Sequence, residues 1–414
     1  MPPAKYSSFL IFLFFLNWGI PSLSSERFGV EMMLDGTFSQ ISQSETPLLH
    51  TGAQRFLNGR GILLASFNIN SNLSIYYEGR YDQLEPLNYR DVLDGYGYGY
   101  PVLQGFLRYS TKLPSNLTLQ IGKFGSPFGY FLSHNYPNQN PLISAPLIYT
   151  HPTSIRPDKI PQDAYDLIRW QYYNAYTPNP YAREYEGLPI LNYPYSTGIM
   201  GYGDWARFDY RFAAVNSSLS NPLNLGTPGQ RIQWVAGAGY SPSPRLRLGT
   251  SLARGPYLDA SVQSSLPTGT RIDDFNQQVL GFDLQFSLNH LEIISELVFN
   301  SFQVPNIYKP LGTTGYYIQA KQTLSPRIYV AVRWDQLISD RLTTFYYDYY
   351  DSSYRWDSNV NSLEVALGVR ITEKMLLKTS YQYRRTDGVY TYSENNVGMQ
   401  LVYSFDVKKL FRIP

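Results

Sequence analysis

The sequence of 414 residues contains no cysteine, only four histidines and few charges of either sign. The absence of cysteine excludes disulfides, thiolate metal sites and cysteine nucleophiles. Charged residues make up 16% of the chain and the net charge is +2, which argues against nucleic acid as a partner, because phosphate binding requires a strongly basic face. Hydrophobic residues reach 43%, too many for a disordered chain.

Long apolar runs are also missing, except for one at the N-terminus. The run covers residues 9–16, follows Lys5, and precedes small residues that end at Ser24. A positive start, a short apolar core and small residues at the end predict a secretory signal peptide over 1–24. The core is shorter than the roughly 20 residues of a membrane-spanning helix, although an anchor is the alternative. An exported chain without cysteine fits a bacterial envelope.

The rest of the chain, residues 25–414, alternates between apolar and polar residues with a period of two. Between 361 and 373, for example, Leu363, Val365 and Leu367 alternate with Glu364 and Ala366. A strand points successive side chains to opposite faces, so each such segment has one apolar and one polar face. The pattern therefore predicts an all-β protein.

The lengths of these segments separate a membrane barrel from a soluble sandwich. Many run about ten to thirteen residues, enough to cross a bilayer at a tilt. Short connections also alternate with long ones, as expected when tight turns lie on one rim of a barrel and long loops on the other. We predict a transmembrane antiparallel β-barrel of about 16 strands, with 14 and 18 as alternatives. The predicted strands are 27–41, 60–70, 73–84, 101–113, 117–128, 197–205, 206–216, 230–242, 246–258, 277–290, 291–304, 314–325, 328–338, 361–373, 375–387 and 393–406.

The segment 129–196 is too long for a plain connection and interrupts this pattern. It is the third long loop, and residues 161–173 have a proline and acidic residues at their start, which predicts a short helix. Its apolar pieces would be poorly solvated outside the barrel. We therefore predict that it folds into the lumen and sets the narrowest point near Asp163, Asp166 and Arg169. The alternative is an external cap over the mouth.

Charged residues on alternate strand positions indicate that the inside of the barrel is wet, because a charge facing lipid at mid-bilayer costs about 2–4 kcal/mol. Basic positions slightly outnumber acidic ones. They either tune ion passage or only pair across strands and hold the wall. The predicted pore-lining residues are Arg80, Arg108, Lys123, Arg207, Arg211, Arg231, Arg247, Arg333, Arg370, Lys378, Arg384, Glu292 and Glu296.

The last strand carries a family resemblance. Residues 396–405 hold Gly398, Leu401, Tyr403 and a terminal aromatic, Phe405, and this resembles the assembly signal of Gram-negative outer-membrane proteins. The resemblance implies recognition by the barrel-assembly machinery. The tail 406–414 departs from the pattern, because these proteins usually end at the aromatic residue.

The whole layout resembles sixteen-stranded porins, whose third long loop narrows the lumen. The stretch 121–129, Ile-Gly-Lys-Phe-Gly-Ser-Pro-Phe-Gly, is similar to one in porins related to the phosphate-selective porins. The resemblance implies passive diffusion of small hydrophilic solutes or ions through the bacterial outer membrane, with a mild anion preference and outer-membrane lipids as surroundings. A homotrimer and a monomer both stay open.

Other functions have weaker support. No histidine lies on a predicted strand beside a partner serine or carboxylate, so we expect no enzyme, although a loop-borne site is conceivable. We expect no cofactor and no metal, since loop carboxylates such as Asp348, Asp351 and Asp357 lack ligand spacing. The rival is a surface barrel closed by its loops that acts in binding, adhesion or structure, with the tyrosine-rich segment 345–350 as its contact surface.

Overall fold

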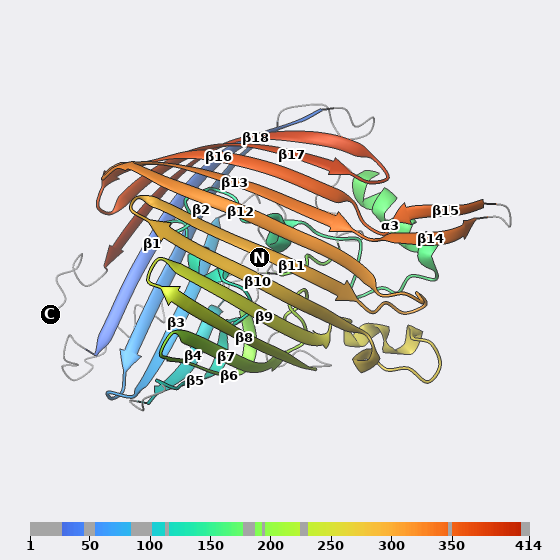
Figure 1. The fold of residues 1–414 in the computed structure, drawn as a ribbon, viewed down its shortest axis with the longest axis horizontal. Coiled ribbons are helices and arrows are strands. Elements are labelled where there is room, and N and C mark those ends of the chain that lie inside the picture. The colour runs from blue at the N-terminus through green and yellow to red at the C-terminus, as the bar shows by residue number, and fades with distance from the viewer. Residues whose placement is uncertain are drawn as a thin grey trace, which may run out of the picture.

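The protein forms one closed β-barrel, shown in Figure 1 from the side. This computed structural model describes residues 27–44, 54–83, 102–111, 116–176, 187–192, 195–223, 231–346 and 350–406. The predicted signal peptide and the tail beyond residue 406 lie outside the described residues. None of the helices within the described ranges is long and apolar enough to cross a membrane.

Sixteen strands close the barrel, as predicted. Around the wall their order is β1-β18-β17-β16-β13-β12-β11-β10-β9-β8-β7-β6-β5-β4-β3-β2, and each pairs antiparallel with its neighbours. Their bounds are β1 Phe28–Ser44, β2 Gln54–Asn68, β3 Leu73–Gln83, β4 Val102–Ser110, β5 Thr118–Gly125, β6 Tyr195–Trp205, β7 Phe208–Asn216, β8 Ile232–Ser243, β9 Leu246–Pro256, β10 Asn276–Leu288, β11 Leu291–Phe302, β12 Leu311–Ser325, β13 Ile328–Ser339, β16 Asn359–Thr372, β17 Met375–Asp387 and β18 Thr391–Asp406.

The alternating apolar and polar residues of each strand form the outer and the inner face of the barrel wall, respectively. On β16, Leu363 and Val365 are 45% and 46% exposed, whereas Glu364 between them is 1% exposed. The same pattern recurs on β13, where Val332 and Trp334 face out and Arg333 faces in. A belt of exposed apolar side chains around a closed sheet is suited to lipid, because no strand edge is left without hydrogen-bond partners.

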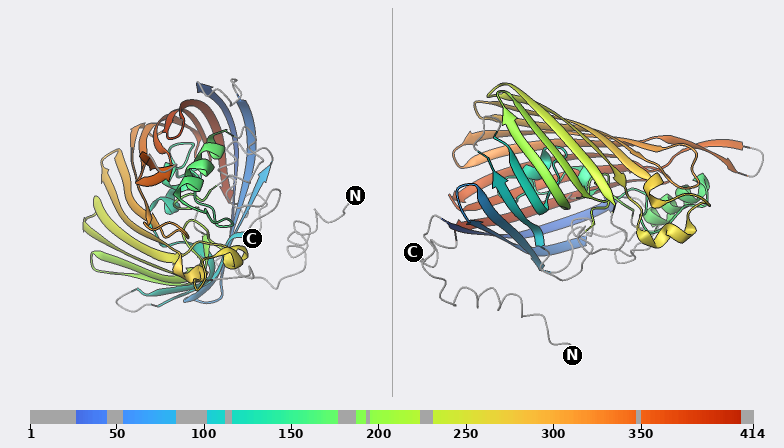
Figure 2. Two further views of the ribbon diagram at one scale, coloured as in Figure 1. Left: turned by 90° about the vertical axis from the view of Figure 1, so that its right-hand side faces the viewer. Right: turned by 90° about the horizontal axis from the view of Figure 1, so that it is seen from below.

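The two rims differ, also as predicted. Tight turns join β6 to β7, β8 to β9, β10 to β11, β12 to β13 and β16 to β17, all at one end. At the other end, strands β14 (Arg341–Tyr346) and β15 (Tyr350–Arg355) form a separate two-stranded sheet that projects beyond the wall (Figures 1 and 2). The predicted strands do not include this hairpin.

The first part of the loop between β5 and β6, with η1 (Phe131–His134) and α2 (Leu147–Thr150), lies inside the ring of strands, as Figure 2 shows in its end-on view. The loop also carries α3 (Ala164–Tyr176), while η3 (Ala260–Ser265) and η4 (Ile272–Asp274) belong to the loop between β9 and β10. Phe128, Phe131 and Ile148 of the loop pack on inward-facing Val279 and Val298 of the wall. The barrel therefore has an apolar core inside part of its lumen, and the predicted inward-folding loop is confirmed.

Candidate functional site in the lumen

Charged side chains of the wall hold the loop in place. On β17, Lys378 is 1% exposed, and its Nζ donates to the backbone oxygens of Pro137, Asn140 and Leu142 at 2.9–3.1 Å. On β16, Glu364 accepts hydrogen bonds from the N–H groups of Ile143 and Ser144. Because buried charges need full sets of partners, these contacts fix the loop backbone against the wall.

Arg333 on β13 completes this arrangement. It is fully buried, pairs with Asp335 at 2.9 Å and Glu364 at 3.0 Å, and donates to the oxygens of Ser144 and Ala145. One guanidinium thus joins two carboxylates of the wall to two carbonyls of the loop. Planar guanidinium groups suit this task because they offer five donors in a fixed geometry.

A third attachment point lies on β11. Glu296 is 2% exposed and accepts hydrogen bonds from the backbone N–H groups of Tyr130 and Phe131, and from the hydroxyl of Tyr149 at 2.8 Å. One carboxylate therefore binds the start of the loop through Tyr130 and Phe131, and α2 through Tyr149. Together with Lys378, Glu364 and Arg333, it forms what we call the loop latch.

The loop then crosses the lumen. Phe131 is bound at β11, yet five residues later the hydroxyl of Tyr136 donates to Glu78 on β3 at 2.7 Å. Burial raises the pKa of Tyr136, so the hydroxyl stays protonated and remains a donor. From β3 to β11 the strand order runs eight steps in either direction, so the two strands face each other. Residues 131–136, the crossing segment, therefore divide the barrel's cross-section into two halves.

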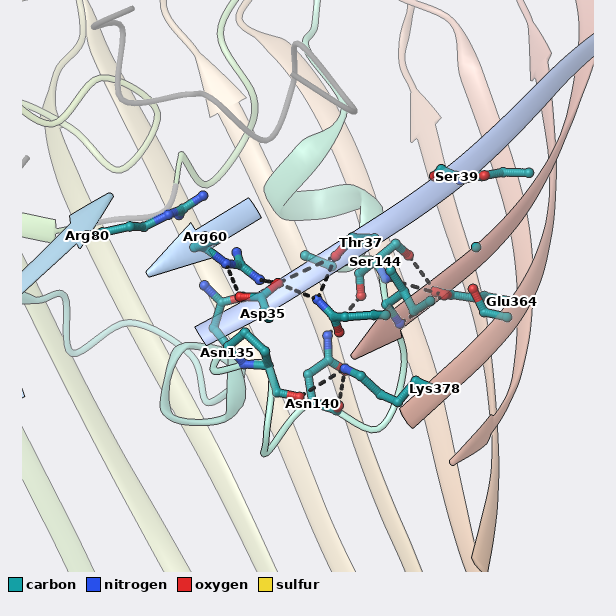
Figure 3. A pocket seen from close by; sticks show the side chains of 17 residues that line it. Asp35, Thr37, Ser39, Arg60, Arg80, Asn135, Asn140, Ser144, Glu364 and Lys378 are labelled. Carbon is teal, nitrogen blue, oxygen red and sulfur yellow. Dashed lines mark hydrogen bonds and ion pairs between the residues drawn. The ribbon is translucent and has the colours of Figure 1, made fainter. Parts of the chain in front are cut away.

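In the half beside β1, β2 and β16–β18, loop residues 137–145 are bound to β13, β16 and β17. A cavity of about 70 Å³ between the loop and the wall is lined by Asp35, Arg60, Lys378 and loop residues such as Asn140 (Figure 3). Arg60 pairs with Asp35 at 2.7 Å, so the charges that face this space are already engaged. A water molecule occupies about 30 Å³ of liquid, so this cavity is of a size for a few waters.

The other half is lined by a charged row on the wall. Asp209 of β7, Gly239 of β8, Gly249 of β9 and Asp283 of β10 are direct neighbours across four strands. Arg247 bridges the two carboxylates, with contacts of 2.7–2.8 Å to Asp209 and 2.6 Å to Asp283. We call this group, which also includes Arg211, the arginine–aspartate row.

Arg211 connects this row to the loop. It lies 3.6 Å from Asp209 and 3.9 Å from Asp283, and it donates to the carbonyl of Gly129 at 3.2 Å. The side chains of Arg211 and Arg247 are 16% and 15% exposed. Two arginines and two aspartates thus form a flat, partly hydrated layer on this part of the wall.

Gly239 and Gly249 lie between Asp209 and Asp283, and their lack of a side chain leaves room for the charged groups. A Cβ atom on Gly239 would collide with a carboxylate oxygen of Asp209 and with Arg247 Nη2. Both are ends of side chains, so we expect Gly239→Ala to fold but to push the pair toward the lumen. Single-channel conductance should fall by up to about twofold, because the path narrows at fixed charge. Gly36→Ala is the control, since a Cβ there meets nothing; equal conductance in both variants would contradict the prediction.

A larger pocket of about 400 Å³ lies between the loop and strands β4–β7. Its walls include the apolar side chains Phe106, Phe124 and Met200, with Arg108 and Arg211 at its polar side. The neighbouring His134 adds no positive charge at neutral pH, because burial lowers its pKa. This pocket and the arginine–aspartate row therefore lie side by side on the wall, with Asp209 and Arg211 belonging to both.

The structure places the predicted pore-lining residues in several settings. Some share the inner face and stay partly exposed, others lie there but are covered by the loop, and a third set forms ion pairs near the rims. Arg80, Arg108, Arg211 and Arg247 belong to the first group, Arg333, Lys378 and Glu296 to the second, and Arg231–Asp273, Lys321–Glu292 and Arg384–Glu394 are ion pairs of the third. Arg370 lies on the inner face of β16 near the short-turn rim and is exposed.

Three parts of this prediction need correction. Arg333, Lys378 and Glu296 do not face water, because the loop covers them. Lys123 follows the outward-facing Leu119 and Ile121 at two-residue spacing, and the register of β5 is continuous; it therefore lies on the outer face. Arg207 lies in the tight turn before β7, where it donates to the carbonyl of Pro242 at 3.1 Å, so it belongs to the rim.

The predicted helix exists, but not at the crossing. Asp163 caps its first turn by accepting from the N–H of Asp166 at 2.8 Å, and Arg169 lies 3.8 Å from Asp166. Leu167 and Trp170 pack with Leu342, Trp356 and other residues of the outer loops, and α3 lies at the long-loop end of the barrel beside the base of β14 (Figure 1). Within the described residues, α3 therefore lies at the long-loop end, and the crossing segment is bound to strands on opposite sides of the barrel.

The residues of the predicted assembly signal lie on β18. Leu401 is 42% exposed on the outer face, and Tyr403 and Phe405 follow it at two-residue spacing with ring centroids 5.3 Å apart. Gly398 faces inward, where a Cβ would lie 3.1 Å from Ile143 of the loop. Its role in assembly stays a prediction, but its lack of a side chain makes room for the loop.

Comparisons with known proteins agree with this architecture. In sequence, the chain matches no family model and no curated protein. In structure, it is similar to an anion-selective porin from Comamonas acidovorans (TM-score 0.56, 10% identity, 91% of this chain and 99% of that one). It is also similar to the outer-membrane channel DcaP of Acinetobacter baumannii (0.54, 9%, 92% and 99%) and to the trimer form of OmpT, an outer-membrane protein of Vibrio cholerae (0.51, 8%, 92% and 100%). The chain thus has the fold of the outer-membrane porins.

Proposed function

We propose that this protein is a porin through which small hydrophilic solutes and ions diffuse passively across the bacterial outer membrane. One observation carries the proposal: the closed barrel has an apolar outer face and a charged inner face, and beside the latched loop a pocket of about 400 Å³ is lined by Arg108, Asp209 and Arg211. Barrels of 16 strands are wide enough for an aqueous channel. Nothing in this function requires chemistry on the solute, so we propose no enzyme activity.

We further propose a mild preference for anions. On the wall between β4 and β10, three arginines, Arg108, Arg211 and Arg247, lie near two aspartates, Asp209 and Asp283, and Asp283 is 5% exposed. An excess of guanidinium groups along a narrow path favours anions. The preference is weak because each aspartate is paired with arginine.

Planar bilayers test this function. Purified protein should give discrete conductance steps, and a salt gradient should give a reversal potential that corresponds to a chloride-to-potassium permeability ratio of roughly two. Folding is checked independently by heat-modifiable migration on gels. If folded protein gives no conductance steps, the loop-closed surface barrel is favoured instead. If it gives steps with a cation preference, the proposed porin function stands and the proposed anion preference is wrong.

The assembly is a separate proposal. The trimer form of the Vibrio protein has a similar fold, and we propose that this chain also forms homotrimers within outer-membrane lipids. Native mass spectrometry of detergent-extracted protein measures the number of chains directly, and a mass of one chain would overturn the proposal.

A further inference from the structure

We propose that the 400 Å³ pocket between the loop and strands β4–β7 binds small organic monocarboxylates that carry an apolar ring, such as benzoate. This inference rests on the proposed porin function, because the ligand reaches the pocket through the lumen. It assigns to the pocket a chemical class of solute that the general diffusion function does not specify.

The first argument concerns Arg108. Among the described residues, no carboxylate lies within ion-pair distance of it, in contrast to Arg211 and Arg247 of the neighbouring row. With its amide oxygen turned toward Arg108, Gln120 accepts hydrogen bonds from Nε and Nη2 at 2.8 and 2.9 Å. The guanidinium is thus held by a neutral partner and retains its full positive charge toward a ligand. A carboxylate is the group that this planar fork recognises best.

The second argument concerns what surrounds the charge. The guanidinium of Arg108 lies over the ring of Phe106, with 5.2 Å between Cζ and the ring centroid. Phe124 and Met200 continue the apolar wall. A small inorganic anion would gain little from such a surface, whereas an aromatic ring would bury apolar area against it.

The third argument concerns size and the remaining charge. A volume of about 400 Å³ falls in the range of small-molecule sites, roughly 300–1,000 Å³. Asp209 also lines the pocket, but two arginines offset its charge: Arg247 makes two hydrogen bonds to it and Arg211 lies 3.6 Å from it. Therefore the pocket offers one unpaired positive group beside an apolar surface, which matches an apolar monoanion rather than a dianion or a neutral sugar.

The test is a block experiment in bilayers, combined with calorimetry on the detergent-solubilised protein. Benzoate should reduce the current in a saturable manner and bind with measurable heat. Acetate lacks the ring and benzamide lacks the charge, so each should bind about tenfold or more weakly. Arg108→Gln should weaken benzoate by a similar factor, whereas Arg370→Gln, on the same inner face near the rim, should leave it unchanged.

The other outcomes distinguish a failure of this inference from a failure of the proposed function. Equal effects of acetate and benzoate would show an ion effect without a binding site, and block by glucose but not by benzoate would reassign the pocket to sugars. If the protein conducts but benzoate neither blocks the current nor gives a heat of binding, the porin function stands and this inference is wrong. Absence of conductance together with binding heat would remove the porin function alone.

Discussion

Replacing residues 130–191 with a short glycine–serine linker should raise single-channel conductance severalfold and weaken ion selectivity. The crossing segment joins opposite walls at Glu296 and Glu78, and residues 137–145 of the loop are bound to β13, β16 and β17. Without the loop, a barrel of 16 strands leaves a wide aqueous channel. Conductance and reversal potential measure both effects.

Two controls separate the loop from general damage. Deleting the hairpin 341–355, which projects beyond the barrel (Figure 2), should leave conductance unchanged. In the intact loop, Ser133 lies on the crossing segment and is exposed, and the chain has no native cysteine. A bulky thiol reagent on Ser133→Cys should therefore reduce the current. If the shortened protein conducts like the intact one and the reagent has no effect, the narrowest point lies elsewhere.

The barrel itself was predictable because lipid and water impose opposite demands on alternate residues. The exposed Leu363 and buried Glu364 follow directly from the period of two. Strand number and order followed from the alternation of short and long connections. The hairpin of β14 and β15 escaped prediction because it extends past the membrane, where neither face must be apolar, so the alternation is lost.

The charged residues were harder to interpret, since the sequence gives the face of a strand but not what covers it. Arg333 and Arg211 have the same pattern around them, yet the loop buries the first completely and leaves the second partly exposed. Lys123 was assigned to the wrong face because the apolar residues beside it, Ile121 and Phe124, do not alternate cleanly. Only the register of β5 shows which of them points inward.

The path of the loop could not be predicted, because it depends on pairs far apart in the sequence. Tyr136 and Glu78 are separated by 58 residues, and Ser144 and Glu364 by 220. The helix over α3 was predicted from its local cap and dipole signals, but its place at the mouth follows from packing with the outer loops. Local sequence signals therefore predict that helix α3 forms, whereas its position in the barrel depends on contacts with residues far away in the sequence.

Arg333→Ala should release the latched loop. The substitution leaves Asp335 and Glu364 buried beside each other without their shared cation, and it removes the donors to the carbonyls of Ser144 and Ala145. Removing one partner of a buried ion pair costs about 3–5 kcal/mol. We expect the heat-modifiable transition on gels to move to lower temperature and the bilayer current to fluctuate between levels as the loop detaches and rebinds.

Arg370→Ala is the matched control, because Arg370 lies on the same inner face but is exposed near the short-turn rim. It should leave both readouts unchanged. The double variant Asp335→Asn, Glu364→Gln in the Arg333→Ala background removes the uncompensated negative charges and should restore part of the lost thermal stability. A steady current and an unshifted transition in Arg333→Ala would show that Lys378 and Glu296 hold the loop without Arg333, and the latch would then have to be assigned to those two residues.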